Sequence, residues 1–263
     1  MMRPKKRYGQ HFLQGAWADK VVDAIAPDAD DRFVEIGPGP GALTLRLAPR
    51  VAHLTAVELD PEMVAALQPH LPANVTLIQQ DFLEADFTSI AGDINVRVAG
   101  NLPYNISSPI LFRLLAAHRS GGRVADATLM LQREVADRIV ARPGTKDYGV
   151  LSIFVQLHAD VRRVLALPPG AFRPAPKVHS AVLQLTFRPP AVPIDDERQF
   201  EAMVRSMFTQ RRKTLSNALK PYADGRGRLA AEALVTAGID PARRPETLQL
   251  QELSRLAAVF LSP

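Results

Sequence analysis

The sequence predicts an α/β protein with a doubly wound sheet, followed by a small all-helical C-terminal domain. Over the first part of the chain, short apolar runs of strand type alternate with helical patterns, as a mostly parallel sheet requires. Beyond the proline-rich segment 188–193, every expected element is helical. We therefore expect a sheet domain at residues 1–187 and a helical domain at residues 188–263, with residues 1–14 as a basic arm that closes over a site on the sheet.

Each element follows from its local pattern. The best-defined start is a helix that Asp60 caps, because Pro61 takes its first position and needs no hydrogen bond there. Strands are expected at residues 32–36, 53–59, 75–79, 96–99, 127–131, 148–156 and 178–187. Helices are expected near residues 16–26, 42–47, 61 onwards, 109–115, 133–142, 197–219, 229–237 and 249–261.

Composition excludes several classes of site. The 263 residues include no cysteine, so thiolate catalysis and thiolate-bound metals are excluded. The six histidines are scattered without ligand spacing, and we expect no metal. No apolar run reaches the roughly 18 residues that cross a bilayer, and the basic amino terminus lacks the apolar core of a secretory signal. We therefore expect a cytoplasmic protein that contacts no membrane.

The positive charge gathers near the two ends of the chain. A net charge of +5 favours a polyanionic partner when the cations are clustered. A solvated basic tail is the alternative for the amino-terminal cluster, but Tyr8, Phe12 and Leu13 lie close by and favour a segment folded over a ligand. We expect a polyanion to bind at two clusters: Lys5, Lys6 and Arg7, and Arg211, Arg212 and Lys213.

A glycine loop follows the first strand of the expected sheet. Gly37, Gly39 and Ala42 satisfy the permissive form of a dinucleotide fingerprint. Pro38 and Pro40, however, remove two of the N–H groups that a pyrophosphate needs. The acidic Glu35 also disfavours an anion. The pattern is typical of sites for S-adenosylmethionine, a cationic sulfonium, and we expect Glu35, Gly37, Gly39 and Gly41 to contact it.

Two further acids stand at the ends of the next two strands. Glu58, with Leu59 beside it, lies where a carboxylate can accept hydrogen bonds from both ribose hydroxyl groups. Asp81 can accept from the N6-amine of adenine while Phe82 covers the ring. Each acid alone could be a helix cap or a solvated strand end. Together with the glycine loop they predict an adenosine site on a Rossmann-like methyltransferase sheet.

The segment Asn101-Leu102-Pro103-Tyr104 follows the fourth strand and therefore lies at the same edge. We expect the Asn101 side-chain oxygen and the Pro103 carbonyl to accept the two hydrogens of a planar amine. Tyr104 and the loop aromatic Phe172 are expected to stack on either face of that base. For Phe172 the alternative is a ring packed into the core.

Seven ordered motifs carry a resemblance that covers nearly the whole chain. They are residues 9–13 (GQHFL), 35–41 (EIGPGPG), 58–60 (ELD), 80–81 (QD), 101–107 (NLPYNIS), 172–178 (FRPAPKV) and 208–213 (FTQRRK). In these motifs the chain resembles the KsgA-type ribosomal RNA adenine dimethyltransferases.

The resemblance implies transfer of methyl groups from S-adenosylmethionine to the N6-amines of two adjacent adenines near the 3′ end of small-subunit rRNA. It also implies S-adenosylhomocysteine as product, a substrate within a pre-30S particle and a monomeric enzyme. Donor-site positions in that family match His11, Leu13, Gly37, Glu58, Asp81 and Asn101. We also expect Gln10, in the first motif, to contact the donor. The chain departs at His11, where many relatives have Asn.

Three alternatives stay open at this point. One is a large-subunit rRNA adenine methyltransferase of the macrolide-resistance type, although such relatives tend to carry Ile where Leu102 stands. Another is a noncatalytic ribosome-assembly factor on the same fold, which a broken donor site would favour. The third is a nicotinamide-dependent dehydrogenase. Against it, Pro38 and Pro40 remove N–H groups that a pyrophosphate needs, and the sequence offers no evident catalytic acid–base residue.

Overall fold

The chain forms two compact units. The computed structural model describes residues 10–92, 94–121 and 123–261. One unit consists of residues 1–136 and 160–187, and the other of residues 137–159 and 188–263. Among the described residues, no helix combines the length and the apolar character needed to cross a bilayer.

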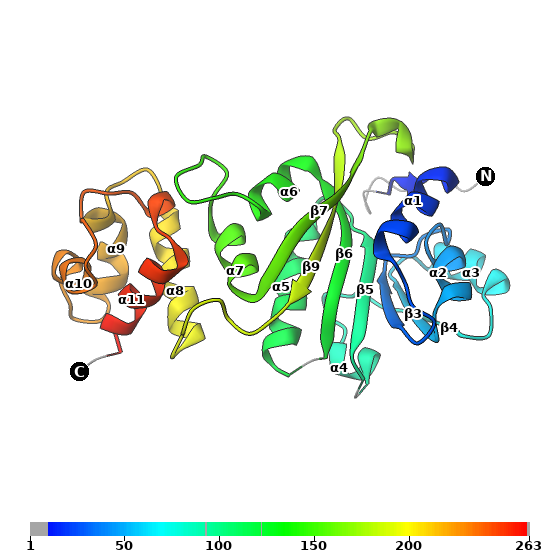
Figure 1. Cartoon of the computed structure of the whole chain (residues 1–263), viewed down its shortest axis with the longest axis horizontal. Helices are drawn as coiled ribbons and strands as arrows, with labels where there is room; N and C mark the ends of the chain where they lie inside the picture. The colour runs from blue at the N-terminus through cyan, green and yellow to red at the C-terminus, as the bar shows by residue number, and fades with distance from the viewer. Residues whose placement is uncertain (1–9, 93, 122, 262–263) are drawn as a thin grey trace. The chain divides into compact units, whose positions relative to one another are not determined.

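A seven-stranded sheet with the order β4-β3-β2-β5-β6-β9-β7 forms the first unit (Figure 1). Neighbours from β4 to β6 pair in parallel, and β9 joins antiparallel to β6. The chain order reverses between β2 and β5, and ligands bind outside the carboxyl ends of strands at such a point. The expected α/β fold is therefore confirmed. The strands are β2 Arg32–Ile36, β3 His53–Glu58, β4 Val75–Gln79, β5 Val96–Asn101, β6 Val124–Gln132, β7 Ala159–Leu167 and β9 Ser180–Phe187.

Helices flank this sheet and bury its apolar side chains. Val21, Phe33 and Leu54 are at most 1% exposed in one continuous core. The expected start at Asp60 is confirmed, because its carboxylate accepts the Glu62 N–H at 3.1 Å. The helices are α1 Gly15–Ile25, α2 Thr44–Leu47, α3 Pro61–Leu67, α4 Phe87–Ala91, α5 Ser107–Arg119 and α6 Arg133–Ile139.

A two-stranded sheet ties the amino-terminal arm to the loop after β7. Strand β1, Phe12–Leu13, pairs antiparallel with β8, Phe172–Arg173. The Gln14 N–H also donates to the Ala171 carbonyl at 2.9 Å. Residues 10–13 are thereby held at the sheet edge where β2 and β5 end. Neither strand was expected from the sequence, because two residues are too few to show an alternating pattern.

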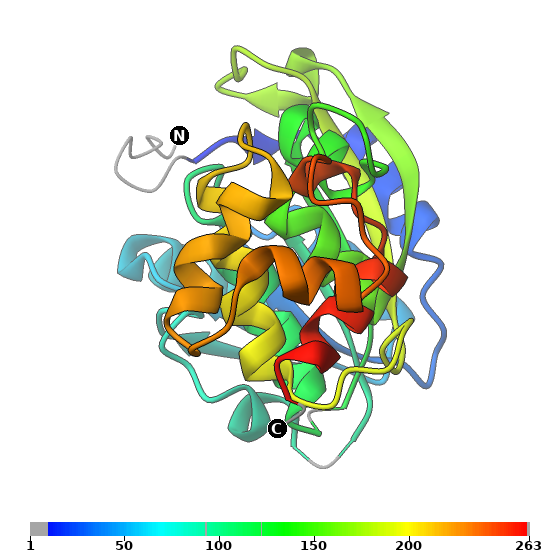
Figure 2. The same cartoon turned by 90° about the vertical axis from the view of Figure 1, so that its left-hand side faces the viewer.

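The second unit is helical. Helix α8 contacts α9 and α11, and α10 contacts both α9 and α11; in Figure 2 these helices are coloured yellow to red. The helices are α7 Val150–His158, α8 Glu197–Thr209, α9 Leu215–Asp224, α10 Ala230–Thr236 and α11 Leu250–Val259.

The strand expected at residues 148–156 is wrong, because residues 150–158 form α7. Nearly all of α7 is buried, so its sequence shows no polar face from which a helical period could be read. This segment also lies outside the sheet unit, in contrast to the expected division at residue 187. The buried Tyr148 hydroxyl donates to the Leu248 carbonyl at 3.0 Å, and the Gly144 N–H donates to the Glu246 carbonyl at 2.7 Å.

The single helix expected at residues 197–219 is two helices. Helix α8 ends at Thr209 and α9 begins at Leu215. The Lys213 N–H donates to the Gln210 carbonyl at 2.8 Å in the turn between them. Thr214 has extended backbone and is the N-cap of α9. Arg211, Arg212 and Lys213 therefore lie in a turn and not on a helix.

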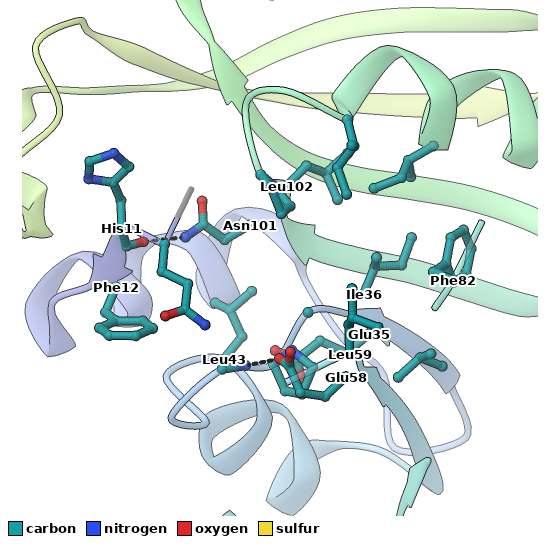
Figure 3. A pocket seen from close by; sticks show the side chains of 18 of the residues that line it. His11, Phe12, Glu35, Ile36, Leu43, Glu58, Leu59, Phe82, Asn101 and Leu102 are labelled. Atoms are coloured by element: carbon teal, nitrogen blue, oxygen red, sulfur yellow. Dashed lines mark hydrogen bonds between the residues drawn. The ribbon is translucent and has the colours of Figure 1, made fainter. Parts of the chain in front are cut away.

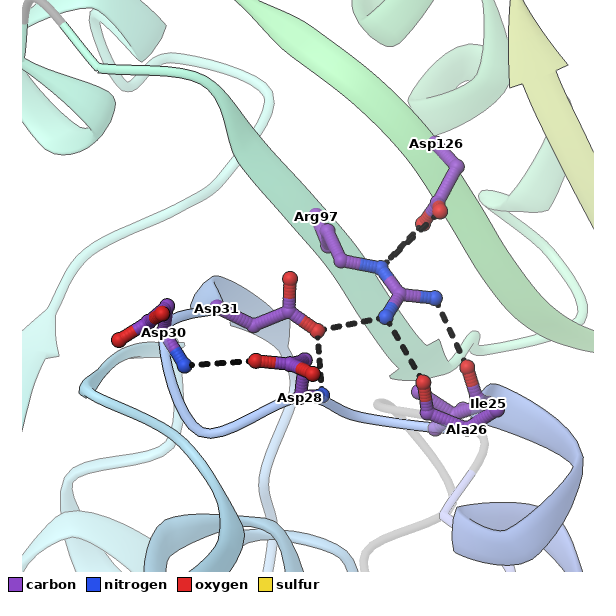
Figure 4. A network of polar contacts seen from close by, with 7 residues as sticks. All are labelled: Ile25, Ala26, Asp28, Asp30, Asp31, Arg97 and Asp126. Carbon is purple, nitrogen blue, oxygen red and sulfur yellow. Dashed lines mark hydrogen bonds and ion pairs between the residues drawn. The ribbon is translucent and has the colours of Figure 1, made fainter.

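One arginine connects four segments at the amino ends of the strands (Figure 4). Arg97 on β5 pairs with Asp31 at 2.6 Å and with Asp126 on β6 at 3.0 Å. It also donates to the carbonyls of Ile25 and Ala26 at 2.8 and 3.1 Å, where α1 ends. The guanidinium therefore holds the end of α1 and the start of β2 against the middle of the sheet. It does so at the amino ends of the strands, away from the carboxyl ends where β2 and β5 diverge.

Candidate functional site

A cavity of about 320 Å³ lies at the carboxyl ends of β2 to β5 (Figure 3). It includes side chains from the arm, the glycine loop and three later strand ends, so the fold brings together most of the expected site residues. Those that line it are Gln10, His11, Leu13, Glu35, Gly37, Gly39, Glu58, Leu59, Asp81, Phe82, Asn101, Pro103 and Tyr104.

The glycine loop offers no glycine amide to a phosphate. The N–H groups of Gly37, Gly39 and Gly41 donate to the Val57 carbonyl, the Glu58 carboxylate and the Pro38 carbonyl, each at 2.9 Å. Pro38 and Pro40 have no N–H. A pyrophosphate cradle needs several converging loop amides, and this loop uses its own internally. The dinucleotide interpretation therefore fails on geometry as well as on sequence.

Gly41 does not line the cavity. Its φ is +87°, and a Cβ at this position would lie 2.5 Å from the Leu67 side chain. Gly41 is needed for the close approach of the loop to α3. The expected contact between Gly41 and a ligand is therefore wrong in this structure.

Three carboxylates face the cavity. Glu58 accepts the N–H groups of Gly39 and Asp60, each at 2.9 Å, and thereby shapes the loop. Asp81 accepts the Leu83 N–H at 2.9 Å. No lysine or arginine is among the described residues that line the cavity. The site therefore suits a cationic ligand and disfavours an anionic one.

Apolar side chains form a slot beside these acids. Leu59 is 42% exposed at the cavity although it is large and apolar. Phe82 follows the carboxyl end of the neighbouring strand β4 and packs edge-on against Phe87, with the ring centroids 6.3 Å apart. A planar ring suits a slot between apolar surfaces. Phe12, which the sequence analysis did not assign, also lines the cavity; its ring lies about 3.5 Å from the position of a Cβ on Gly39.

The arm contributes polar groups to the opposite wall. Gln10 donates to the Asp60 carboxylate at 3.2 Å, which connects the arm to the start of α3. The His11 ring stacks on Tyr104, with centroids 5.4 Å apart and planes at 26°, and its Nδ1 lies 2.7 Å from the Pro174 carbonyl oxygen. The arm is therefore part of the site, as the sequence indicates for residues 10–13.

Asn101 has a fixed amide orientation. Its Nδ2 donates to the His11 backbone carbonyl at 2.8 Å (Figure 3). The side-chain oxygen remains as an acceptor at the cavity. The Pro103 carbonyl already accepts the Ile106 N–H at 3.2 Å, so one of its two lone pairs is left for a ligand.

Tyr104 lines the cavity, but Phe172 does not. The Tyr104 hydroxyl lies 2.9 Å from Ser180 Oγ, a partner for which the sequence gives no signal. Burial raises the pKa of this phenol, so it stays protonated at neutral pH. Phe172 is 1% exposed within the core, and the expected stacking of Phe172 on a base is therefore wrong in this structure. Its pairing in β8 turns the ring inward, as the core alternative required.

The helical unit has a separate basic hollow. It is lined by Gly144, Thr145, Lys146, Thr209, Gln210, Arg211, Arg212, Lys213 and Glu246. The Arg211 side chain already has partners within the protein: it donates to the Thr145 carbonyl at 3.1 Å and lies 3.8 Å from the Glu246 carboxylate. Lys146, Arg212 and Lys213 are exposed. The expected cations Lys5, Lys6 and Arg7 lie outside the described residues.

Metal chemistry has no candidate site in the described part of the chain. No group of three or more His, Cys, Asp or Glu side chains there could hold a metal ion. The three acids of the cavity instead come from different strand ends and face a slot shaped for an organic ligand.

Comparisons with known proteins agree with this geometry. The family model for ribosomal RNA adenine dimethylase matches residues 1–259. The ribosomal RNA small subunit methyltransferase A of Syntrophotalea carbinolica is 46% identical, over 98% of this chain and 97% of that protein. A dimethyladenosine transferase from Plasmodium falciparum has a similar structure, with a TM-score of 0.78 at 24% identity and coverage of 94% and 96% of the two chains. The 23S rRNA methyltransferase ErmE follows with a TM-score of 0.69 at 26% identity, covering 95% and 100%.

Proposed function

The chain belongs to the ribosomal RNA adenine dimethylase family, and we propose that its cavity binds the methyl donor while Asn101 to Tyr104 hold the target adenine. The protein is an S-adenosylmethionine-dependent rRNA adenine dimethyltransferase. Small-subunit rRNA is its substrate class, because the small-subunit methyltransferase A relative is 46% identical and the large-subunit enzyme ErmE only 26%. The large-subunit alternative is not favoured.

The observation that carries the proposed site is the acceptor-rich, cation-free lining of the cavity. S-adenosylmethionine carries a sulfonium and an ammonium, and supplies the methyl group from the sulfonium. Glu35 and Glu58 offer negative charge beside the glycine loop, and Asp81 lies near Phe82 and Leu83, where an adenine amine and ring fit. The internally bonded loop amides explain why a donor without phosphate suits this loop.

For the chemical step we propose that the chain orients a weak nucleophile. The lone pair of an adenine amine is delocalised into its ring. Acceptance of its hydrogens by Asn101 Oδ1 and the free lone pair of the Pro103 carbonyl localises that pair and directs it at the methyl carbon. The rate gain is then mainly orientation and stabilisation of developing charge. As the new C–N bond forms, the bond between the sulfonium sulfur and the methyl carbon breaks and S-adenosylhomocysteine leaves. The nitrogen becomes acidic only at that point and passes its proton to solvent, so no strong base is needed.

The target base takes the face of Tyr104 that the His11 ring now covers. Stacking on one aromatic face is worth about 1–3 kcal/mol, which is similar to the few kcal/mol needed to flip a base. Phe172 is buried, so it cannot cover the second face of the base. We assign that face to the His11 ring, which must first move off Tyr104 to let the base in. For the second methylation one hydrogen is gone, and one of the two acceptors is released.

Net RNA affinity must then come from phosphate contacts. We assign these to Arg212, Lys213 and Lys146 of the basic hollow, with the amino-terminal cations as further candidates. The two adjacent adenines near the 3′ end, a pre-30S substrate, a monomeric state and a cytoplasmic location remain proposals that rest on the family resemblance.

The test is transfer of labelled methyl groups to small ribosomal subunits from a strain that lacks these modifications. Label should appear as N6,N6-dimethyladenosine in small-subunit rRNA. Large subunits and fully methylated small subunits are the controls. Labelling of large subunits alone would contradict the small-subunit assignment, and no labelling of any RNA would contradict the activity.

A further inference from the structure

Glu35 is the one carboxylate of the cavity that is both deeply buried and incompletely bonded. Glu35 is the second-last residue of β2, directly before Ile36, and is 2% exposed. Its Oε2 has no hydrogen-bond partner among the described residues. In Glu58, by contrast, each carboxylate oxygen accepts a backbone N–H. A buried, unsatisfied carboxylate oxygen that borders a cavity marks a position where a ligand group completes the bonding.

Among the described residues that line the cavity, the surroundings of Glu35 contain negative charge and no lysine or arginine to compensate it. Glu58 faces it from β3, Asp60 lies at the start of α3, and Asp81 lies beyond β4; the Thr44 hydroxyl and amide lie beside it on α2. His11 and Tyr104 are the remaining titratable groups on the described lining. Burial is the main cause that raises the pKa of Glu35 to about 7, and the charge of Glu58 adds to it, while Thr44 lowers it.

We propose that in the empty cavity Glu35 takes up a proton as the pH falls to neutral and below, and that it loses this proton when the positively charged part of a ligand arrives. This rests on the assignment of the cavity as the donor site. The O–H bond of the carboxyl breaks, the proton passes to solvent, and the carboxylate left behind pairs with the cation. Glu35 is then the residue by which the cavity selects for positive charge, and donor binding is linked to proton release.

The linkage has a defined sign. The folded-state pKa of about 7 lies above the ordinary value of 4.5, and a bound cation returns it toward that value. Below pH 7 the ligand must displace a proton, so its affinity falls as the pH falls. Above pH 7 the contribution of Glu35 is constant, and any further change comes from the α-amino group of the ligand, which the wild type and Glu35→Gln meet alike. The linkage predicts that S-adenosylmethionine binds about tenfold more weakly at pH 6 than at pH 8.

Isothermal titration calorimetry tests this directly. S-adenosylmethionine is titrated into the full chain at pH 6.5 and at pH 8 in buffers of different ionisation enthalpy. The wild type should release roughly three-quarters of a proton at pH 6.5 and about one-tenth at pH 8. Glu35→Gln keeps the shape of the side chain but cannot ionise. It should bind the donor without releasing a proton, and its affinity should not fall as the pH falls from pH 8 to pH 6.5. Absence of release from the wild type, or equal release from Glu35→Gln, would overturn the proposal.

A second measurement covers the case in which Glu35→Gln does not fold. Wild-type protein labelled with ¹³C at glutamate side chains is titrated with and without the donor. One carboxyl carbon should titrate near pH 7 in the empty protein and at clearly lower pH when the donor is bound. If no glutamate titrates above its ordinary range, the proposal is wrong.

Two further ligands identify which cation acts. S-adenosylhomocysteine keeps the ammonium but has no sulfonium, and 5′-methylthioadenosine has neither. Release with both S-adenosylmethionine and S-adenosylhomocysteine identifies the ammonium, and release with S-adenosylmethionine alone identifies the sulfonium. Equal release with 5′-methylthioadenosine would overturn the role of charge. If Asp81→Ala and Glu35→Gln both leave donor affinity unchanged, the site assignment fails; if Asp81→Ala weakens binding but no proton is released, only this inference fails.

Discussion

The Asn101 side chain donates to the His11 backbone carbonyl at 2.8 Å, which joins the end of β5 to the amino-terminal arm. The bond uses the NH₂ group and leaves the Asn101 oxygen toward the cavity. Because the partner is a backbone atom, this orientation does not depend on the identity of residue 11.

Asn101→Ala should reduce turnover by at least about 100-fold, the usual cost of losing one well-placed group that stabilises developing charge. The dissociation constant of the donor should rise only a few-fold, because the acids and the apolar slot stay in place. Single-turnover methylation and donor calorimetry measure the two effects. His11→Asn is the comparison variant: it keeps the backbone bond to Asn101, so the single-turnover rate with saturating RNA should stay near wild type, although loss of the ring weakens RNA binding. A near-normal rate for Asn101→Ala would contradict the proposed mechanism.

Tyr104 separates the effect of a ring face from that of a hydroxyl. Tyr104→Ala should lower kcat/KM for RNA by roughly 5- to 150-fold, the equivalent of about 1–3 kcal/mol of stacking. Tyr104→Phe loses only the contact with Ser180 and should stay within about threefold of wild type, since the ring remains. Donor affinity should be unchanged in both variants. Equal losses in both variants would mean that the hydroxyl, and not the stacking face, is what matters.

The basic hollow should govern the salt dependence of RNA binding. Replacing both Arg212 and Lys213 with Ala should flatten the slope of log K against log salt by about one unit per lost phosphate contact. Donor affinity should not change. Arg211 is kept, because its bond to the Thr145 carbonyl holds the loop of the hollow.

Arg198→Ala is the matched control for that variant. Arg198 is an exposed cation at the opposite end of α8 and should leave the slope as in wild type. The control removes one cation and the double variant removes two. If the control flattens the slope by half as much as the double variant does, the effect is one of net charge, and the hollow is not a specific phosphate site.

Much of the fold was predictable where a local pattern has one physical cause. The strand ends that present Glu58 and Asn101, and the Asp60 cap, follow from apolar runs and from capping chemistry. Helix α7 was misassigned because it is buried on nearly every side, so periodicity could not separate helix from strand. The end of α8 was missed because Thr214, which caps α9, stands within a run of otherwise helical residues.

The site was predictable as a set of residues but not as a set of contacts. Spacing indicates that the acids and Asn101 meet at one sheet edge. It does not indicate that Phe172 turns inward, that Gly41 packs on Leu67 or that Ser180 meets Tyr104. These depend on long-range pairing, such as that of β1 with β8, which two-residue strands do not encode in any local pattern.

The Arg97 network should support stability and not catalysis. Arg97→Met removes the partner of two carboxylates whose side chains are only 21% and 18% exposed, Asp31 and Asp126. Breaking a buried ion pair from one side costs about 3–5 kcal/mol, so urea unfolding of the sheet unit should show a loss near the lower end of that range. Donor affinity of the folded protein should be unchanged, because the network lies at the amino ends of the strands.

Arg50→Met provides the comparison for Arg97→Met. Arg50 pairs with Asp23 at 3.0 Å, but these side chains are 49% and 67% exposed. An exposed pair contributes at most about 1 kcal/mol, so this variant should be close to wild type. Removing the carboxylates together with the arginine, in Arg97→Met with Asp31→Asn and Asp126→Asn, should recover part of the loss, since no unpaired charge remains. If the triple variant is no more stable than Arg97→Met, the cost comes from the lost bonds to the Ile25 and Ala26 carbonyls and not from stranded charge.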